Sequence, residues 1–195
     1  MTSDELAQAV TYLLDRQAIL DCLHTYCRAM DRLDRELLMT VYHEDAIDDH
    51  GIWVGNREYF AAELLAYHEA NQYSTQHVIT NHTCQIDGPV AHAETYYYFA
   101  AMNKEGAPLT LSGGRYIDRF EKRNGRWAIA ARLCLSDWHG EPGPSPLSPE
   151  LRALLNSGGP PSRDRNDPSY MRPLRVRRPE DIGHRPPLPG VAPAP

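Results

Sequence analysis

The sequence lacks the features that would place a protein in a membrane, an oxidising compartment or a metal-binding class. No apolar run approaches the roughly 20 residues that a membrane-spanning helix needs. The N-terminus, Met1-Thr-Ser-Asp-Glu, has neither the basic start nor the apolar segment of a signal peptide. The spacing of the four cysteines fits no metal site. We therefore expect a cytoplasmic protein with no membrane partner, no metal and reduced, mostly buried thiols at Cys22, Cys27, Cys84 and Cys134.

Common catalytic motifs are also missing. The chain contains no glycine-rich phosphate loop and no nucleophile elbow, and Gly113-Gly114 lies inside a predicted strand, where it indicates a β-bulge. His77 and His82 are five residues apart on a predicted strand, so alternation turns them to opposite faces and excludes a shared metal ion. The contiguous run Asp48-Asp49-His50 is only a weak metal signal.

Proline is scarce in the first part of the chain and dense in the last. Of 16 prolines, 14 lie in residues 140–195. We expect residues 1–139 to form the folded domain and residues 140–195 to be a Pro-rich arm or tail, either docked in extended form or disordered. This tail carries eight Arg and six Asp or Glu, so the formal charge of −6 for the chain becomes −8 for residues 1–139. A domain this acidic is a poor partner for nucleic acid.

The hydrophobic pattern changes its period from 3.6 to 2 near residue 74. Before that point it predicts a long helix over residues 4–30, capped by Thr2 and Glu5, then shorter helices after Asp34 and Asn56 with a short strand, 46–54, between them. The apolar stripe of the long helix comprises Leu6, Val10, Leu13, Leu14, Leu20, Leu23, Cys27 and Met30. Four strand-like runs follow, at 75–86, 90–102, 109–122 and 126–138, with a hairpin turn at Asn124-Gly125.

A chain in which helices come first and an antiparallel meander of strands follows is expected to have an α+β fold. We expect a curved antiparallel sheet that wraps around the N-terminal helices as a cone, a cystatin-like α+β barrel. The open end of such a cone is a deep pocket, lined by the inward residues of the strands and by the end of the first helix.

Polar residues near this expected pocket are the candidates for chemistry. Tyr26 and Asp31 lie near the end of the first helix, where an ordinary helix-terminal carboxylate is the alternative for Asp31. Strict alternation puts His77, Ile79 and Asn81 on one face of the first long strand. A histidine at the edge of an apolar cavity can act as an acid or a base near neutral pH.

The later strands offer weaker candidates. Tyr96, Tyr97 and Tyr98 are consecutive, so neighbours face opposite ways, and at least two of the three are expected to serve sheet packing. In the last strand, alternation assigns Ile129 and Leu133 to the core, with Trp127, Ala131 and Leu135. Arg132 then faces solvent or, if both faces are covered, is a buried cation that needs a partner.

The order of these segments resembles a known family. The resemblance rests on the stretch ILDCLHTYCRAMDRLD at 19–34, Tyr42-His-Glu-Asp-Ala, residues 51–55, Ser74-Thr-Gln-His with Asn81, and GGRYIDRFEKRNGRWAIAARLCLSDW at 113–138. Together these are similar to the SnoaL-like proteins of the nuclear transport factor two-like superfamily, which includes scytalone dehydratase and the bile acid dehydratases. The similarity covers about residues 5–139 and implies the same α+β cone.

The resemblance also implies roles for individual residues. Asp31 would accept a hydrogen bond from His77, whose other nitrogen would remove a proton from carbon and then protonate the leaving oxygen, while Tyr26 would donate to the oxygen that gains charge. His50 lies on the strand where dehydratases tend to use a tyrosine. The residues expected to contact substrate are Arg132, His50, Tyr42, Asn81 and Tyr98.

These roles imply a cofactor-independent lyase, most simply a dehydratase of a hydrophobic oxygenated ring compound. The same scaffold hosts isomerases, C–C lyases that release a small aldehyde, and non-catalytic binding or assembly modules, and fold resemblance does not choose among them. The family also implies a homo-oligomer, a trimer or a dimer.

Overall fold

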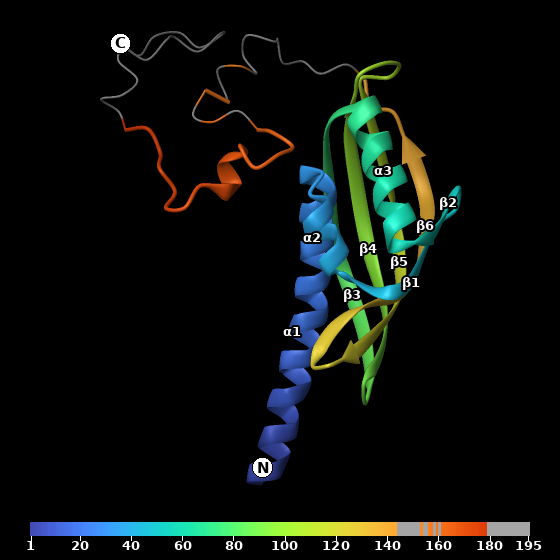
Figure 1. The fold of residues 1–195 in the computed structure, drawn as a ribbon, viewed down its shortest axis with the longest axis vertical. Coiled ribbons are helices and arrows are strands. Elements are labelled where there is room, and N and C mark those ends of the chain that lie inside the picture. Colours follow the sequence, from blue (N-terminus) through green and yellow to red (C-terminus); the bar gives the residue numbers. More distant parts are fainter. Residues whose placement is uncertain (144–152, 154–155, 158, 160, 179–195) are drawn as a thin grey trace. The chain divides into compact units, whose positions relative to one another are not determined.

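The structure is a computed structural model that describes residues 1–143, 153, 156–157, 159 and 161–178 (Figure 1). The chain divides into two compact units, Met1–Gly143 and Pro144–Pro195, and each is described by itself. In the second unit, the described residues include a short 3-10 helix, η1 (Pro168–Tyr170), with Asp167 as its N-cap. Much of the predicted Pro-rich arm, including its apolar residues Leu151, Leu154 and Leu155, lies outside the described residues.

The first helix, α1 (Ser3–Arg32), begins at the expected capping box, in which Thr2 and Glu5 each bind the other's backbone N–H. It ends where Leu33 adopts a left-handed backbone. The apolar stripe is buried only in the second half of the helix, from Ile19 to Met30. The expectation that the whole stripe faces the core was wrong for Leu6, Val10, Leu13 and Leu14, because the N-terminal part of α1 extends past the ends of the strands (Figure 1).

Two shorter helices and six strands complete the first unit. The helices are α2 (Arg35–Thr40) and α3 (Arg57–Asn71), and Asp34 and Asn56 cap them. The strands are β1 (Tyr42–His50), β2 (Trp53–Asn56), β3 (Gln72–Asp87), β4 (Val90–Asn103), β5 (Leu109–Arg123) and β6 (Arg126–Gly140). None of the helices in the described part of the chain combines the length and the apolar character that crossing a bilayer requires.

The strands form one curved sheet in the order β2-β1-β6-β5-β4-β3, with α1 and α3 packed on one face (Figure 1). The predicted α+β class is confirmed. All neighbouring pairs are antiparallel except β1 and β6, which run parallel, and the sheet does not close, since β2 and β3 are its edges. The predicted hairpin at Asn124-Gly125 is confirmed by positive φ at both residues, 52° and 78°.

Two irregularities change which side chains point inward. The pairing of β3 with β4 shifts between Ile79 and His82, so His77 and Ile79 face inward before the shift and Cys84 after it, while Asn81 is exposed. The prediction that strict alternation holds along this strand was therefore wrong.

The same effect occurs in β6, where the pairing with β5 shifts between Ile129 and Ala131. Trp127 and Ile129 are buried before the shift and Arg132 is buried after it, whereas Leu133 is 42% exposed. The assignment of Leu133 to the core was wrong, because one extra residue reverses the faces of the rest of the strand.

The predicted bulge at Gly113-Gly114 is confirmed by a register shift between these two residues. Here β5 approaches β6 so closely that a Cβ on Gly114 would lie 1.9 Å from the carbonyl oxygen of Leu135 and 2.9 Å from the hydroxyl oxygen of Tyr97. Only glycine fits against a backbone at that distance.

Gly114→Ala is therefore expected to lower the free energy of unfolding by about 1–3 kcal/mol, as measured by urea unfolding. The matched control is Gly140→Ala, because a Cβ at Gly140 meets nothing within 4 Å. The control is expected to stay within about 0.5 kcal/mol of the wild type. Equal stability of the two variants would contradict the close approach of the strands.

Candidate active site

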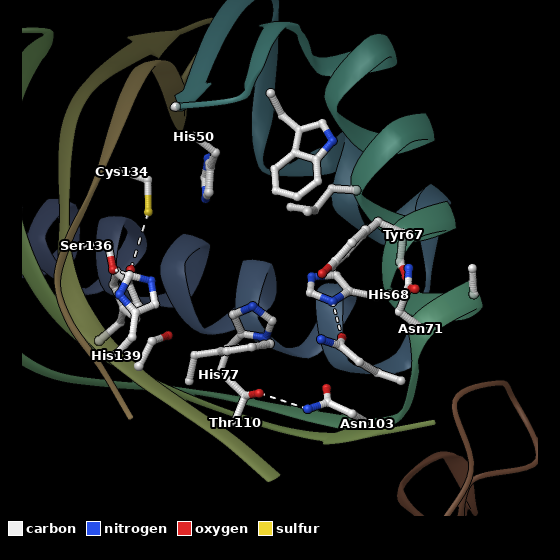
Figure 2. A pocket seen from close by; sticks show the side chains of 18 of the residues that line it. His50, Tyr67, His68, Asn71, His77, Asn103, Thr110, Cys134, Ser136 and His139 are labelled. Atoms are coloured by element: carbon white, nitrogen blue, oxygen red, sulfur yellow. Dashed lines mark hydrogen bonds between the residues drawn. The ribbon is translucent and has the colours of Figure 1, made fainter. Parts of the chain in front are cut away.

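A cavity of about 860 Å³ opens between the curved sheet and helices α1 and α3 (Figure 2). All of its lining residues belong to the first unit. Aromatic and aliphatic side chains form part of its walls: Tyr26, Trp53, Leu64, Tyr67, Tyr97, Phe99 and Tyr116. Four histidines also line it: His50, His68, His77 and His139. Other polar side chains, among them Lys104 and Glu105, make up much of the remaining lining. A cavity of this size, with apolar walls and polar groups together, has the character of a small-molecule site.

His77 and Asp31 form a close pair at this cavity. Asp31 Oδ1 accepts a hydrogen bond from Nδ1 of the ring at 2.7 Å, and the backbone N–H of His77 donates to both carboxylate oxygens, at 3.0 and 3.2 Å. Because a carboxylate can only accept, the proton of a neutral His77 lies on Nδ1. Among the described residues none hydrogen-bonds Nε2, so this nitrogen is left with a lone pair at the cavity.

Helix α1 places Asp31 for this contact. The helix continues through Arg32, two residues beyond the predicted end at Met30, so Asp31 lies in its last turn and not beyond it. The side chains of Asp31 and His77 are 14% and 7% exposed, respectively. A pair this shielded from water gains more from its electrostatic attraction than a surface pair does.

Aromatic rings fix the orientation of the His77 ring. Phe99 lies 4.8 Å from it, His68 5.8 Å and Tyr26 6.2 Å, measured between ring centroids, and the last two are edge-on. Nδ1 of His68 is in turn hydrogen-bonded to Gln72 at 2.5 Å. The imidazole of His77 is therefore held in a single orientation by packing as well as by Asp31.

Tyr26 lies fully buried at the centre of the site, and its hydroxyl is 3.5 Å from Nε2 of His50. The guanidinium of Arg132 lies over the rings of both Tyr26 and Tyr116, at 4.3 and 4.1 Å from their centroids. Burial raises the pKa of Tyr26 well above its ordinary value, although the charge of Arg132 acts in the opposite direction. The hydroxyl therefore keeps its proton and can donate it in a hydrogen bond.

A second histidine–carboxylate pair lies on β1. The carboxylate of Asp48 is completely buried; its Oδ1 contacts Nδ1 of His50, and its Oδ2 accepts a hydrogen bond from the Tyr42 hydroxyl at 2.5 Å. His50 lines the cavity, but Tyr42 does not. The expectation that Tyr42 contacts substrate is corrected, because its hydroxyl is turned to Asp48 behind the cavity wall.

Arg132 is likewise placed behind the wall. It binds Asp118 through two hydrogen bonds of 2.7 and 2.9 Å, and neither side chain is exposed. The charge of Asp118 outweighs burial and raises the pKa of Arg132, so the guanidinium remains charged. The expectation that Arg132 binds substrate is corrected: it is a buried cation with a partner, the second of the two alternatives left by the sequence.

Two further predicted residues lie outside the cavity. Asn81 is exposed because of the irregularity in β3, and Tyr98 is 53% exposed and packs against Trp138. In β4 the alternation instead turns Tyr97 inward, where its ring stacks on Tyr116 at 4.6 Å. The expectation that Asn81 and Tyr98 contact substrate is thus corrected.

The structure therefore gathers Tyr26, Asp31, His50 and His77 around one cavity. Sequence reasoning missed His68, Tyr97, Phe99 and the half-buried thiol of Cys134 as lining residues. Regular alternation through β4 would have found Tyr97 and Phe99, since they share a face. Within the described ranges, no group of three or more His, Cys, Asp or Glu side chains is placed to hold a metal ion.

Comparison with known proteins gives the context of this geometry. A family model described as the SnoaL-like domain matches residues 11–133. No curated protein matches the chain.

Solved structures share the fold at low sequence identity. One is a protein from Novosphingobium aromaticivorans named after scytalone dehydratase, with 17% identity, a TM-score of 0.63, and coverage of 70% of this chain and 93% of the other. Another is the hexachlorocyclohexane dehydrochlorinase LinA-type3 from Novosphingobium barchaimii, with 18% identity, a TM-score of 0.66, and coverage of 72% of this chain and 99% of the other. A third, of unknown function and with a cystatin-like fold, comes from Nostoc punctiforme. It has 19% identity, a TM-score of 0.54, and coverage of 64% of this chain and 92% of the other.

Proposed function

Since the chain belongs to the SnoaL-like domain family, we propose that it is a cofactor-independent lyase, most simply a dehydratase of a hydrophobic oxygenated ring compound. The observation that carries this proposal is the contact between Asp31 and His77, a residue that lines the cavity, because it leaves the other ring nitrogen of His77 free for a substrate in that cavity.

In the proposed reaction, Nε2 of His77 takes a proton from a carbon next to a carbonyl or an aromatic ring. Asp31 stabilises the imidazolium that forms and keeps the ring in one tautomer. The hydroxyl of Tyr26 donates to the oxygen on which negative charge develops. The C–O bond then breaks as the new C=C bond forms, and His77 returns its proton to the departing oxygen, so that water leaves and the enzyme is restored.

The cavity supports a ring compound as the substrate. Its volume of about 860 Å³ exceeds what a small acyclic metabolite would fill, and aromatic side chains such as Trp53 and Phe99 provide flat apolar contacts. Two of the similar structures carry the names of elimination enzymes, a dehydratase and a dehydrochlorinase, which supports elimination over isomerisation or C–C cleavage.

The test is a panel of cyclic β-hydroxy ketones and hydroxylated aromatic ring compounds, incubated with the protein in D2O. We expect a compound that loses the mass of one water and a new conjugated absorption band. An isomerase would give a product that has lost no water and differs in mass only by exchanged deuterium, and a C–C lyase would give two fragments, so mass spectrometry separates the alternatives. A panel that binds, by thermal shift, but gives neither product nor deuterium exchange at carbon would reject the proposal.

A further inference from the structure

The N-terminal part of helix α1 carries large apolar side chains that its own domain leaves uncovered. Leu6, Val10 and Leu13, here called the N-terminal stripe, are 50%, 46% and 63% exposed, and Leu14 beside them is 65% exposed. This part of the helix extends past the ends of the strands (Figure 1). Large apolar side chains gathered on one exposed surface, as these are, are typical of a surface that binds a partner.

The domain packs against the other side of the same helix. Lys122 and Trp127 donate hydrogen bonds to Oδ1 of Asp15 at 2.7 and 2.8 Å. Nη1 of Arg16 donates to the carbonyl oxygen of Cys84 at 3.0 Å. At 3.6 residues per turn, the N-terminal stripe is centred about 140° around the helix from these two contact residues. The stripe therefore faces away from the sheet, and what covers it comes from outside this domain.

The spacing of the N-terminal stripe is that of a coiled coil. Steps of four and three residues continue it in both directions along α1, through Ser3, Leu6, Val10, Leu13, Gln17 and Leu20. Every one of these side chains is exposed or half-buried. Leu6, Leu13 and Leu20 take the d positions of the heptad and Val10 an a position, a combination that favours two parallel strands. The occupant that fits this seam is a second helix with the same repeat.

The charged residues beside the seam also fit a parallel pair. Arg16 takes a g position and Asp21 the e position five residues later, and these are the positions that form ion pairs between parallel helices. Arg16 pairs with no carboxylate in the described part of the chain, since its hydrogen bonds go to neutral oxygens of Tyr12 and Cys84. Asp21 is exposed, and its Oδ1 accepts a hydrogen bond only from the amide of Gln17 among the described residues. In a parallel pair, Arg16 lies next to Asp21 of the partner subunit.

A membrane surface fits the same helix less well. Amphipathic helices that bind membranes carry Lys and Arg on their polar face and are attracted to anionic lipids. Residues 3–16 of α1 contain three acidic residues, Asp4, Glu5 and Asp15, against a single Arg16. The segment is therefore acidic and is repelled by such a surface.

We propose that residues 3–20 of α1 bind the same segment of a second copy of this chain as a parallel two-stranded coiled coil. Because the domain lies on the opposite side of the helix, the two domains then lie on the outer sides of the pair. Of the two assemblies that the family implies, this arrangement selects the dimer. The proposal is independent of the lyase activity, since no residue of this segment lines the cavity.

The experiment is size-exclusion chromatography with light scattering on the full-length protein over a dilution series. The wild type is expected to have twice the mass of one chain, and Leu6→Glu/Leu13→Glu the mass of one chain, because each glutamate would be buried in the seam. The matched control is Gln8→Glu/Thr11→Glu. It adds the same two charges at exposed positions on another side of the same helix, and it is expected to remain a dimer.

A cross-link tests the direction of the helices. Leu6→Cys places a thiol at a d position, which meets its own counterpart only if the helices are parallel. Mild oxidation is therefore expected to give a disulfide-linked dimer on a non-reducing gel. Gln8→Cys, at a position that faces away from the seam, and the wild type with its four native cysteines are expected to give none.

Three results would overturn the proposal. The first is a wild type that is monomeric at every concentration, and the second is an assembly that survives Leu6→Glu/Leu13→Glu in a protein whose circular dichroism shows it to be folded. The third is a dimer in which Leu6→Cys forms no cross-link. Binding of a monomeric wild type to vesicles of anionic lipid, lost in Leu6→Glu/Leu13→Glu, would assign the N-terminal stripe to a membrane surface instead.

Discussion

Replacing His77 by alanine is expected to lower kcat/KM by about a thousandfold, because the reaction loses the group that both removes and returns the proton. Asp31→Asn is expected to have an effect of similar size. Asparagine has nearly the same shape, but it no longer carries the negative charge that stabilises the imidazolium of His77. The measurement is initial-rate kinetics on the ring compound identified by its loss of water.

Folding is the main concern for the Asp31 variant. The carboxylate also accepts hydrogen bonds from the backbone N–H of His77, so its loss can cost about 1 kcal/mol of stability. Circular dichroism and thermal unfolding of both variants separate this loss from a loss of chemistry. His92→Ala is the matched control, because His92 is exposed on the same sheet and does not line the cavity. Full activity in either His77→Ala or Asp31→Asn would reject the assignment.

The contact between Asp31 and His77 was predictable because it depends only on where the first helix ends and on the position of one residue in β3. The resemblance to the family named Tyr26, Asp31 and His77, and these positions tolerate small errors in the predicted boundaries. Helix α1 ends two residues later than expected, at Arg32, yet its last turn still brings Asp31 to β3. The contact between His50 and Asp48 was not predictable, since the sequence offers Asp48 only as part of an acidic run.

Bulges explain the wrongly assigned strand faces, including those of Asn81 and Leu133. The bulge at Gly113-Gly114 has a sequence marker, because glycine permits the close approach of β5 and β6, and it was predicted. The irregularities near Asn81 in β3 and Ala130 in β6 contain neither glycine nor proline. Nothing local distinguishes these residues from ordinary strand positions, so every face assigned beyond them was reversed.

The partner of Arg132 shows the consequence for a buried charge. If β5 and β6 paired regularly from the hairpin at Asn124-Gly125, with no bulge, Asp118 would lie opposite Ala131. One extra residue in β6 makes Arg132 the cross-strand neighbour of Asp118, and of Asp48 on β1 as well. Pairing of buried charges therefore depends on a register that composition and alternation do not fix.

Arg132→Met is expected to lower the free energy of unfolding by about 3–5 kcal/mol, because it leaves the carboxylate of Asp118 uncompensated in the core. The double variant Arg132→Met/Asp118→Leu removes both charges and is expected to recover most of that loss. Urea unfolding followed by circular dichroism measures all three proteins. A control is Arg115→Met, whose partner Asp137 is 39% exposed and whose loss is expected to cost no more than about 1 kcal/mol.

The double variant also separates stability from positioning. The guanidinium of Arg132 is packed against the ring faces of Tyr26 and Tyr116, and methionine fills that space without a charge. If the double variant is stable but binds the ring compound more weakly, Arg132 holds the Tyr26 hydroxyl in place in addition to balancing Asp118. If both the stability and the binding return to wild-type values, Arg132 and Asp118 contribute to the packing of the core and not to the position of Tyr26. A double variant as unstable as Arg132→Met alone would contradict charge compensation as the reason for the pair, and would leave the packing of the guanidinium between the two rings as the larger contribution.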